Sequence, residues 1–151
     1  MTAVLSNPDK EFRVRKPVNA LLATLIALGG GGLSTLTSAT SAAAATPTCN
    51  WSASYYGAWV PNYGSPSSVN VNCALTLGNY NNVAVGTLQE TLNLCYGEHL
   101  VVDQDFGAAT DAALRRAQAK AGTTADGDYG PATRKAIKHK PTSGTTCVRV
   151  P

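Results

Sequence analysis

Charged side chains are scarce in this chain, where Asp, Glu, Lys and Arg make up 14% of the 151 residues. An average soluble protein has about 25%. Residues 1–45 carry four basic and two acidic side chains, and residues 46–151 carry eight basic and seven acidic ones, so the net charges of the two parts are +2 and +1. A nucleic-acid-binding protein needs a basic face to neutralise phosphates. The near-neutral body therefore argues against nucleic acid as a partner.

Histidine is equally rare. His99 and His139 are the only two, which leaves little material for a multi-His metal centre, and neither has a His-Glu-x-x-His spacing. Glu90 and Glu98 are candidates for a catalytic carboxylate pair. They stand on, or just past, a short amphipathic segment and are interpreted as solvated. The sequence therefore predicts no enzyme, no metal and no cofactor.

Long apolar runs are missing except near the N-terminus. Basic residues at 10–16 precede an uncharged stretch at 20–33, and small residues follow up to Ala45. This order is typical of a secretory signal peptide. The apolar run is too short and too rich in glycine for a transmembrane helix, which needs about 20 residues. We expect residues 1–45 to be cleaved off and the rest to be secreted and free of the membrane; a permanent N-terminal anchor is the alternative.

All four cysteines follow this segment. An even number in an exported chain of about 106 residues predicts two disulfides. We favour Cys49–Cys73, which closes an uncharged segment on itself, and Cys95–Cys147, which ties the first predicted helix to the C-terminal tail. Chain entropy alone gives these bridges roughly 3.5 and 4 kcal/mol. No pair has Cys-x-x-Cys spacing and neither histidine lies near a cysteine, so a zinc site is disfavoured.

Residues 46–89 contain no charged side chain at all. Hydrophobic alternation over 68–75 predicts one half-buried strand. The residues before it are interpreted as turns and short extended pieces. Disordered segments are poor in aromatics, so the aromatic residues crowded here indicate an ordered arm. They are Trp51, Tyr55, Tyr56, Trp59 and Tyr63.

Three helices are predicted in the charged half. Apolar residues over 85–95 share one helical face, and Gly97 is expected to end this helix. A second helix over 109–121 has a face of small residues and stops at Gly122. A short third helix begins at Pro131, since proline is tolerated in a first helical turn.

An internal repeat opens the second and third helices. Residues 103–110 (DQDFGAAT) recur as 126–133 (DGDYGPAT), with five of eight positions identical. Asp at the first position can accept backbone hydrogen bonds in a tight turn, and the aromatic ring at the fourth is expected in the core. A calcium loop of the EF-hand type needs further acidic ligands and a final Glu, which both copies lack. We therefore predict structural turns built on Asp103, Phe106, Gly107, Asp126, Gly127 and Gly130.

Together these motifs resemble the peptidoglycan-binding domain family, small three-helix wall-binding modules of secreted bacterial proteins. The family's Leu-x-x-Gly and Val-x-x-Leu-Gln elements correspond to residues 75–78 and 85–89. Its two Asp-Gly turns correspond to the repeats, and a glutamine near the end of the second helix corresponds to Gln118. Gln104 departs from the pattern, which usually has glycine there. If this position requires positive φ, glutamine costs about 1 kcal/mol.

The resemblance implies a mainly α fold: a three-helix peptidoglycan-binding-like domain preceded by a small disulfide-closed, aromatic-rich arm. The expected organisation is a signal peptide at 1–45, the arm at 46–74, the domain at 75–140 and a disulfide-tied tail at 141–151.

The implied function is noncatalytic binding of peptidoglycan glycan strands and stem peptides by a monomer that is secreted, extracellular or cell-wall associated. The alternatives are a protein-interaction or inhibitor module on the same fold, or a small cell-wall hydrolase. A cleft of amides, aromatic faces and an arginine would suit the ligand. Alternatively, the glutamines satisfy buried backbone groups, Tyr129 is core, Arg134 is solvated, and the arm's aromatics pack around Cys49–Cys73 instead of stacking on sugars. The candidate ligand-binding residues are Gln89, Tyr96, Gln118, Tyr129 and Arg134.

Overall fold

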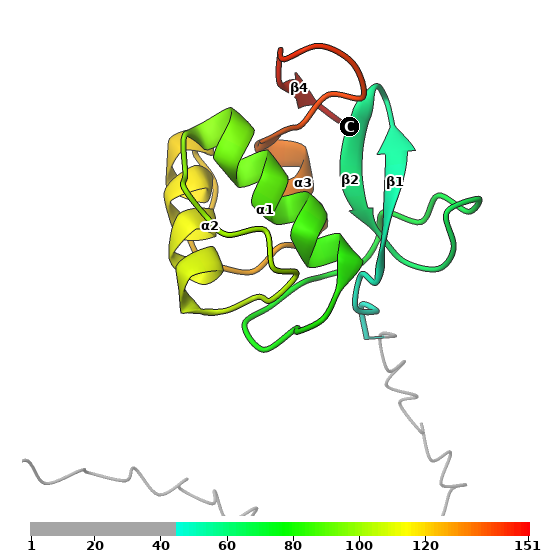
Figure 1. The fold of residues 1–151 in the computed structure, drawn as a ribbon, viewed down its shortest axis with the longest axis horizontal. Coiled ribbons are helices and arrows are strands. Elements are labelled where there is room, and N and C mark those ends of the chain that lie inside the picture. Colours follow the sequence, from blue (N-terminus) through cyan, green and yellow to red (C-terminus); the bar gives the residue numbers. More distant parts are fainter. Residues whose placement is uncertain (1–44) are drawn as a thin grey trace, which may run out of the picture. The chain divides into compact units, whose positions relative to one another are not determined.

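Three helices and two small antiparallel sheets make up the computed structural model, which describes residues 45–151 (Figure 1). The signal-peptide prediction lies outside this range except for Ala45. None of the described helices is long and apolar enough to cross a membrane. In chain order the elements are β1 (Trp51–Tyr55), β2 (Ala58–Asn62), α1 (Val83–Tyr96), α2 (Ala108–Ala121), α3 (Pro131–Ala136), β3 (Lys138–His139) and β4 (Val148–Arg149).

The helix boundaries follow from their capping residues. The side chain of Asn82 accepts a hydrogen bond from the Ala84 amide and so begins α1. Gly97 and Gly122 adopt left-handed φ values of 71° and 74° and end α1 and α2. Pro131 stands in the first turn of α3. The prediction of three helices is confirmed, but they cover only about a third of the described residues, so "mainly α" holds only in part.

Part of the non-helical remainder is a β-hairpin formed by β1 and β2. β1 and β2 pair from Trp51↔Asn62 to Tyr55↔Ala58, and the two-residue turn at Tyr56 and Gly57 has positive φ at both positions, 48° and 78°. Such a turn matches the twist of the strands it connects. The aromatic arm is therefore a regular hairpin, where the sequence suggested turns and short extended pieces.

The strand predicted over 68–75 was wrong apart from isolated bridges at its end, Thr48↔Ala74 and Leu75↔Tyr129. Buried Asn62 explains the difference. Its side chain accepts from the Asn70 amide at 2.6 Å and donates to the Ser68 carbonyl at 2.9 Å. These bonds hold the start of the segment as a loop and take the place of ladder hydrogen bonds.

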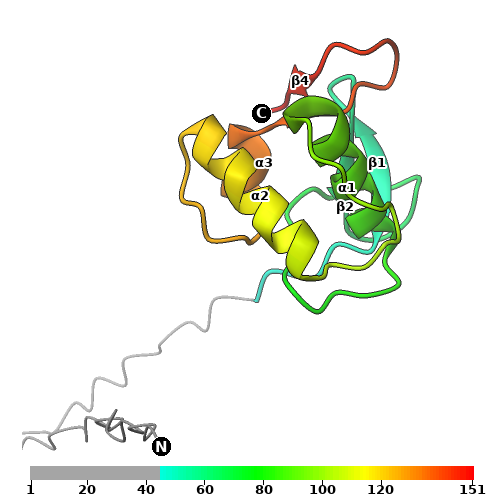
Figure 2. The same ribbon diagram turned by 60° about the vertical axis from the view of Figure 1, so that its left-hand side comes forward.

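The helix α1 lies between the hairpin and α2 and contacts both (Figures 1 and 2). The main core gathers the apolar face of α1, the aromatic rings of both repeats and the first disulfide. Its fully buried large members include Leu75, Leu88, Leu92, Phe106, Leu114 and Tyr129.

The hairpin and the C-terminal segment are both attached to the helical domain, through the two disulfides and a small apolar cluster. Cys49 and Cys73 are bonded to each other and lie in the main core. A second small cluster joins Val60 of β2 to Val150 near the C-terminus. The second disulfide, Cys95–Cys147, fastens the segment between β3 and β4 to α1. Both bridges are the pairs that the sequence favoured.

Candidate functional site

Gln89 of α1 organises the first repeat turn. Its Nε2 donates to the Asp103 carboxylate at 2.7 Å, to the Asp105 carbonyl at 3.1 Å and to the Thr110 hydroxyl at 3.2 Å. Its Oε1 accepts from the Gln104 amide at 3.1 Å. Because Gln89 is only 1% exposed, these bonds satisfy an amide that would otherwise be buried without partners.

Gln118 of α2 does the same for the second turn. Its Nε2 donates to the Asp126 carboxylate at 2.7 Å, to the Asp128 carbonyl at 3.0 Å and to the Thr133 hydroxyl at 2.9 Å, and its Oε1 accepts from the Gly127 amide at 2.9 Å. Hydrogen bonds from these partners lower the pKa of both first-position carboxyls: Gln89 is the main cause at Asp103, and the Asp128 amide followed by Gln118 at Asp126.

Of the other three candidate residues, Tyr96 and Arg134 have hydrogen-bond partners within the protein, and Tyr129 is part of the core. The Tyr96 hydroxyl accepts from the Lys138 amide at 2.7 Å, and partial burial raises the pKa of this phenol. Tyr129 is fully buried. Arg134 is 3% exposed, donates through Nη1 to the Pro151 carbonyl and lies 5.5 Å from the centre of the Tyr55 ring. It is thus not a solvated residue on the helix surface.

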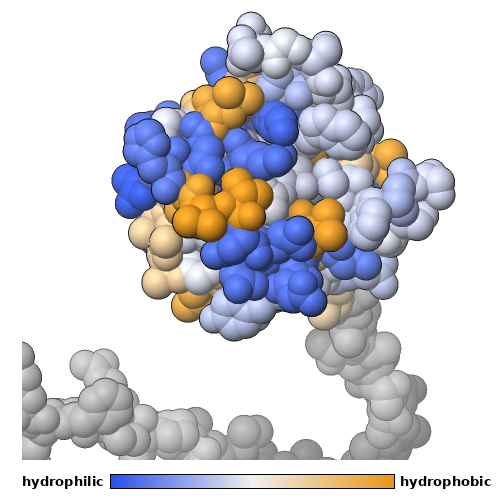
Figure 3. All heavy atoms as spheres, in the orientation of Figure 1, coloured by the Kyte–Doolittle hydropathy of each residue, from blue (hydrophilic) through white to orange (hydrophobic). Residues whose placement is uncertain are grey.

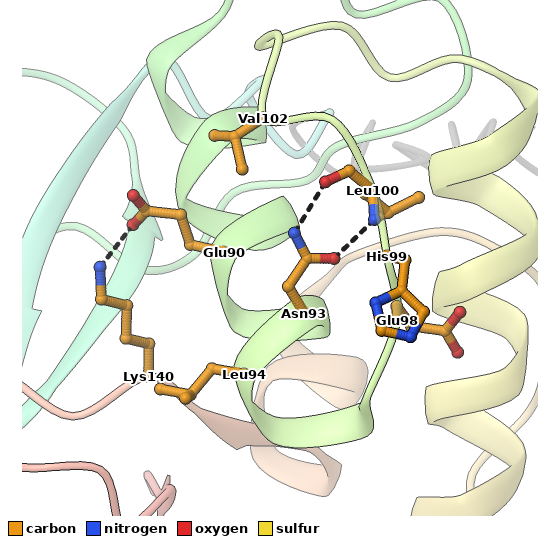
Figure 4. A pocket seen from close by; sticks show the side chains of 8 residues that line it. All are labelled: Glu90, Asn93, Leu94, Glu98, His99, Leu100, Val102 and Lys140. Carbon is orange, nitrogen blue, oxygen red and sulfur yellow. Dashed lines mark hydrogen bonds and ion pairs between the residues drawn. The ribbon is translucent and has the colours of Figure 1, made fainter.

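A groove on the outer face of α1 contains none of these five residues. Its floor is the exposed side of α1, one wall is the segment 98–102 that follows the helix, and Lys140 stands at the opposite side (Figure 4). We call it the α1 groove. It has a volume of about 710 Å³ and is open to solvent. The lining residues are Glu90, Asn93, Leu94, Glu98, His99, Leu100, Val102 and Lys140.

Asn93 fixes the wall of the α1 groove to its floor. Its Nδ2 donates to the Leu100 carbonyl at 2.8 Å, and its Oδ1 accepts from the Leu100 amide at 2.7 Å (Figure 4). Gly86 keeps the same segment close further along, since a Cβ there would lie 3.2 Å from Cγ of Gln104 and 3.8 Å from Cγ1 of Val102. The groove is therefore held in shape by bonds and close packing.

The two carboxylates of the α1 groove are both paired. Glu98 accepts two hydrogen bonds from the Arg116 guanidinium, at 2.6 and 3.0 Å, and this contact holds the pKa of Glu98 below its ordinary value. Glu90 pairs with the Lys140 ammonium at 2.9 Å. The Glu98 side chain points away from the groove's centre, whereas Glu90 and Lys140 meet at its edge (Figure 4).

The lining of the α1 groove also includes the aliphatic side chains of Leu94, Leu100 and Val102, beside the polar Asn93 and His99. Leu94 and Val102 are 45% and 46% exposed, and neighbouring Val101 is 76% exposed. On the face that carries α1, apolar side chains lie interleaved with hydrophilic ones (Figure 3). Isolated exposed apolar residues are common in proteins, but a group of exposed aliphatic side chains beside a groove marks a candidate contact surface.

A smaller hollow of about 260 Å³ lies beside the α1 groove and shares His99 and Leu100 with it. Asp103, Asp105 and the start of α2 line its other side, and Gln89 lies at its base. Of the five residues expected to bind ligand, Gln89 alone lines either hollow. A direct ligand contact by these five residues stays a prediction. Four of them, Gln89, Gln118, Tyr129 and Arg134, are buried and already have structural roles inside the protein.

Most residues of the α1 groove carry no signal of binding in the sequence. Glu90, Glu98 and His99 were candidates there only as catalytic groups. The available signal was Leu94, an apolar residue off the buried stripe of α1, followed by the apolar run 100–102 in a segment with no periodicity.

Comparison with known proteins identifies one family. Residues 81–137 match the model of the family described as a putative peptidoglycan binding domain. The family resemblance drawn from the repeat motifs is therefore confirmed for this segment. Neither the curated proteins nor the solved structures contain a match to the chain.

Proposed function

We propose that this protein binds bacterial peptidoglycan noncovalently through the α1 groove, without cleaving it. The observation that carries the proposal is the position of the groove. Every residue that lines it, except Lys140, lies within the segment 81–137 that matches the peptidoglycan-binding family. The surface most suited to a ligand therefore belongs to the part of the chain with a family assignment.

The shape of the α1 groove supports a polymeric ligand. Its volume of about 710 Å³ falls in the range of ligand sites, roughly 300–1,000 Å³. It is open rather than enclosed, so part of a larger ligand can remain in solvent. Because Asn93 fastens the wall to the floor, little ordering of the protein is needed on binding.

The electrostatics of the α1 groove support binding without catalysis. The general acid of a glycoside hydrolase has a raised pKa, whereas the Arg116 guanidinium lowers the pKa of Glu98. Glu90, the other carboxylate, is paired with Lys140. All four cysteines are bridged, so none of them serves as a thiol nucleophile in the oxidised protein.

A location outside the cytoplasm, free or at the cell wall, is part of the same proposal. Two disulfides are typical of oxidising compartments, and peptidoglycan lies there as well. In that compartment the oxidised protein acts as a binding protein.

The test is sedimentation of the oxidised protein with purified sacculi, at low and at high salt, together with a zymogram. We expect co-sedimentation that persists at high salt, since residues 46–151 carry a net charge of only +1 and screened cationic attraction would contribute little. We expect no cleared band in the zymogram.

Three results would contradict the proposal. A cleared band identifies a hydrolase. Binding that disappears at high salt identifies a purely electrostatic contact, to which the aliphatic side chains of the α1 groove contribute nothing. No binding to sacculi favours the protein-interaction or inhibitor module on this fold.

A further inference from the structure

We infer that the α1 groove takes the peptide stems of peptidoglycan and not its glycan strands, an inference that rests on the function proposed above. Peptidoglycan presents two chemistries. The glycan strands are rows of uncharged sugar rings with hydroxyl and N-acetyl groups. The stems are short peptides with small aliphatic side chains, amide bonds, and charged carboxylates and amines.

The apolar lining of the α1 groove fits the stems. It consists of the aliphatic side chains of Leu94, Leu100 and Val102, and it includes no Trp, Tyr or Phe. Sugar rings stack on broad aromatic faces, whereas alanine-sized side chains pack against aliphatic surface. Aromatic side chains with exposed surface do exist in the protein, but Trp51 and Trp59 stand on the hairpin and do not line this groove.

The charged lining points to the same ligand. Glu90 and Lys140 form an ion pair at 2.9 Å whose side chains are 45% and 35% exposed. An exposed pair of this kind is weak, so a ligand with its own carboxylate and amine can exchange partners with it at little cost. A neutral sugar gains nothing from that exchange, whereas a zwitterionic peptide does.

Lys140 is held in place for this role from both sides of its backbone. Its amide donates to the Thr91 hydroxyl of α1 at 3.3 Å, and its carbonyl accepts from the Trp59 amide of β2 at 2.9 Å. The only other carboxylate of the groove, Glu98, is occupied by Arg116. The charge recognition therefore falls on Glu90 and Lys140.

The experiment compares three ligands with the same oxidised protein: intact sacculi, the soluble glycan strands that an amidase releases from them by hydrolysing the amide bond between each sugar's lactyl carboxylate and its stem, and a free tetrapeptide stem as competitor. We expect binding to intact sacculi, at least a tenfold loss on stem-free glycan, and displacement from sacculi by the free peptide. A tenfold change corresponds to losing about one hydrogen bond to a charged group.

Two groove variants and two matched controls locate the site. Lys140→Met removes the ammonium and is expected to weaken stem binding about two- to fivefold, the worth of an exposed ion pair. Val102→Asp places a carboxylate on the aliphatic lining and is expected to weaken stem binding about tenfold or more. Lys135→Met and Leu77→Asp make the same changes at exposed positions outside the groove and are expected to bind like the parent protein. Circular dichroism establishes that all four are folded.

Each outcome separates the inference from the function beneath it. Equal binding to intact sacculi and to stem-free glycan strands overturns the stem inference and leaves peptidoglycan binding intact, with the exposed tryptophans of the hairpin as the next candidates. If the groove variants are folded and bind normally, the α1 groove is not the binding site, and both the proposed function and the stem inference are wrong about its location. No binding to intact sacculi overturns the proposed function and the inference together.

Discussion

Gln118 makes the same hydrogen bonds to the second repeat turn that Gln89 makes to the first. Each Nε2 donates to the carboxylate of the first Asp, to the carbonyl of the second Asp and to the hydroxyl of the Thr that follows. Each Oε1 accepts from the amide between the two Asp residues. The repeat is therefore larger than its eight residues, because it includes a glutamine on the preceding helix that holds the turn together.

Replacing Gln118 by methionine should lower the free energy of unfolding by about 2–3 kcal/mol. The variant keeps the volume of the side chain but leaves the buried Gly127 amide without its acceptor, and a buried unsatisfied group costs about 1–3 kcal/mol. Chemical denaturation of the oxidised protein measures the loss. Ala119→Met, on the exposed side of the same helix, should change stability by less than about 0.5 kcal/mol. Equal effects of the two substitutions would show that the glutamine is dispensable.

Gln104→Gly should stabilise the protein by about 1 kcal/mol, since left-handed φ costs a residue with a Cβ about that much. Gln104 has φ of 67°, and its counterpart Gly127 has φ of 76°. Gly127→Ala should have the opposite effect, because its φ of 76° is strained for a residue with a Cβ, and that Cβ would also displace the Asp111 carboxylate. Denaturation midpoints at constant slope test both changes. A loss of stability in Gln104→Gly would mean that the packing of the Gln104 side chain near Gly86 outweighs the backbone strain.

The helical half of the fold was predictable because its signals are local. Gly97, Gly122 and Pro131 mark helix ends through their own backbone preferences, and these hold in the structure. The hairpin was harder to predict from sequence. Its turn at Tyr56 and Gly57 needs positive φ at a tyrosine, which propensity does not suggest.

The α1 groove was unpredictable for a different reason. Its parts come from α1, the following segment and Lys140, and only tertiary packing brings them together. Gln89 and Gln118 were predicted to bind ligand, with the satisfaction of buried backbone groups as the alternative, because their spacing alone does not distinguish an amide that binds a ligand from one that binds a turn. Arg134 shows the same limit, since helical spacing cannot reveal that the C-terminal segment covers it.

The free energy of unfolding should fall as pH drops from about 6.5 towards 4, because of His139. This residue is fully buried, its ring lies edge-on to Tyr129 at 6.1 Å, and it donates through Nε2 to the Arg134 carbonyl at 3.0 Å. Burial is the main cause that lowers its pKa from 6.5 to about 4. Between pH 6.5 and 4, His139 therefore binds a proton in the unfolded chain but stays neutral in the folded protein.

The sign follows from linkage: the stability is fully present above pH 6.5, declines below it, and levels off near pH 4 at a loss of at most about 3 kcal/mol. Glu98, Asp103 and Asp126 have lowered pKa values, so their contributions are lost below about pH 4.5 and leave the upper part of the window to histidine. Denaturation at several pH values between 7 and 5 measures the slope. His139→Asn should flatten it, while His99→Gln, at an exposed position, should leave it unchanged. A parent protein with no slope between pH 7 and 5 would refute the assignment.

Mild reduction should open Cys95–Cys147 before Cys49–Cys73. A thiol reductant must reach a sulfur of the bridge, and Cys49 and Cys73 are both 0% exposed in the main core, whereas Cys95 and Cys147 are partly exposed. Pulsed alkylation followed by peptide mapping should show labels on Cys95 and Cys147 first. The chain-entropy contribution of this bridge is about 4 kcal/mol, so the singly reduced form should also be less stable. Cys95→Ser with Cys147→Ser reproduces that form without reductant and should retain the Cys49–Cys73 link. If both bridges open at the same rate, global unfolding precedes reduction, and burial in the folded state does not determine the order.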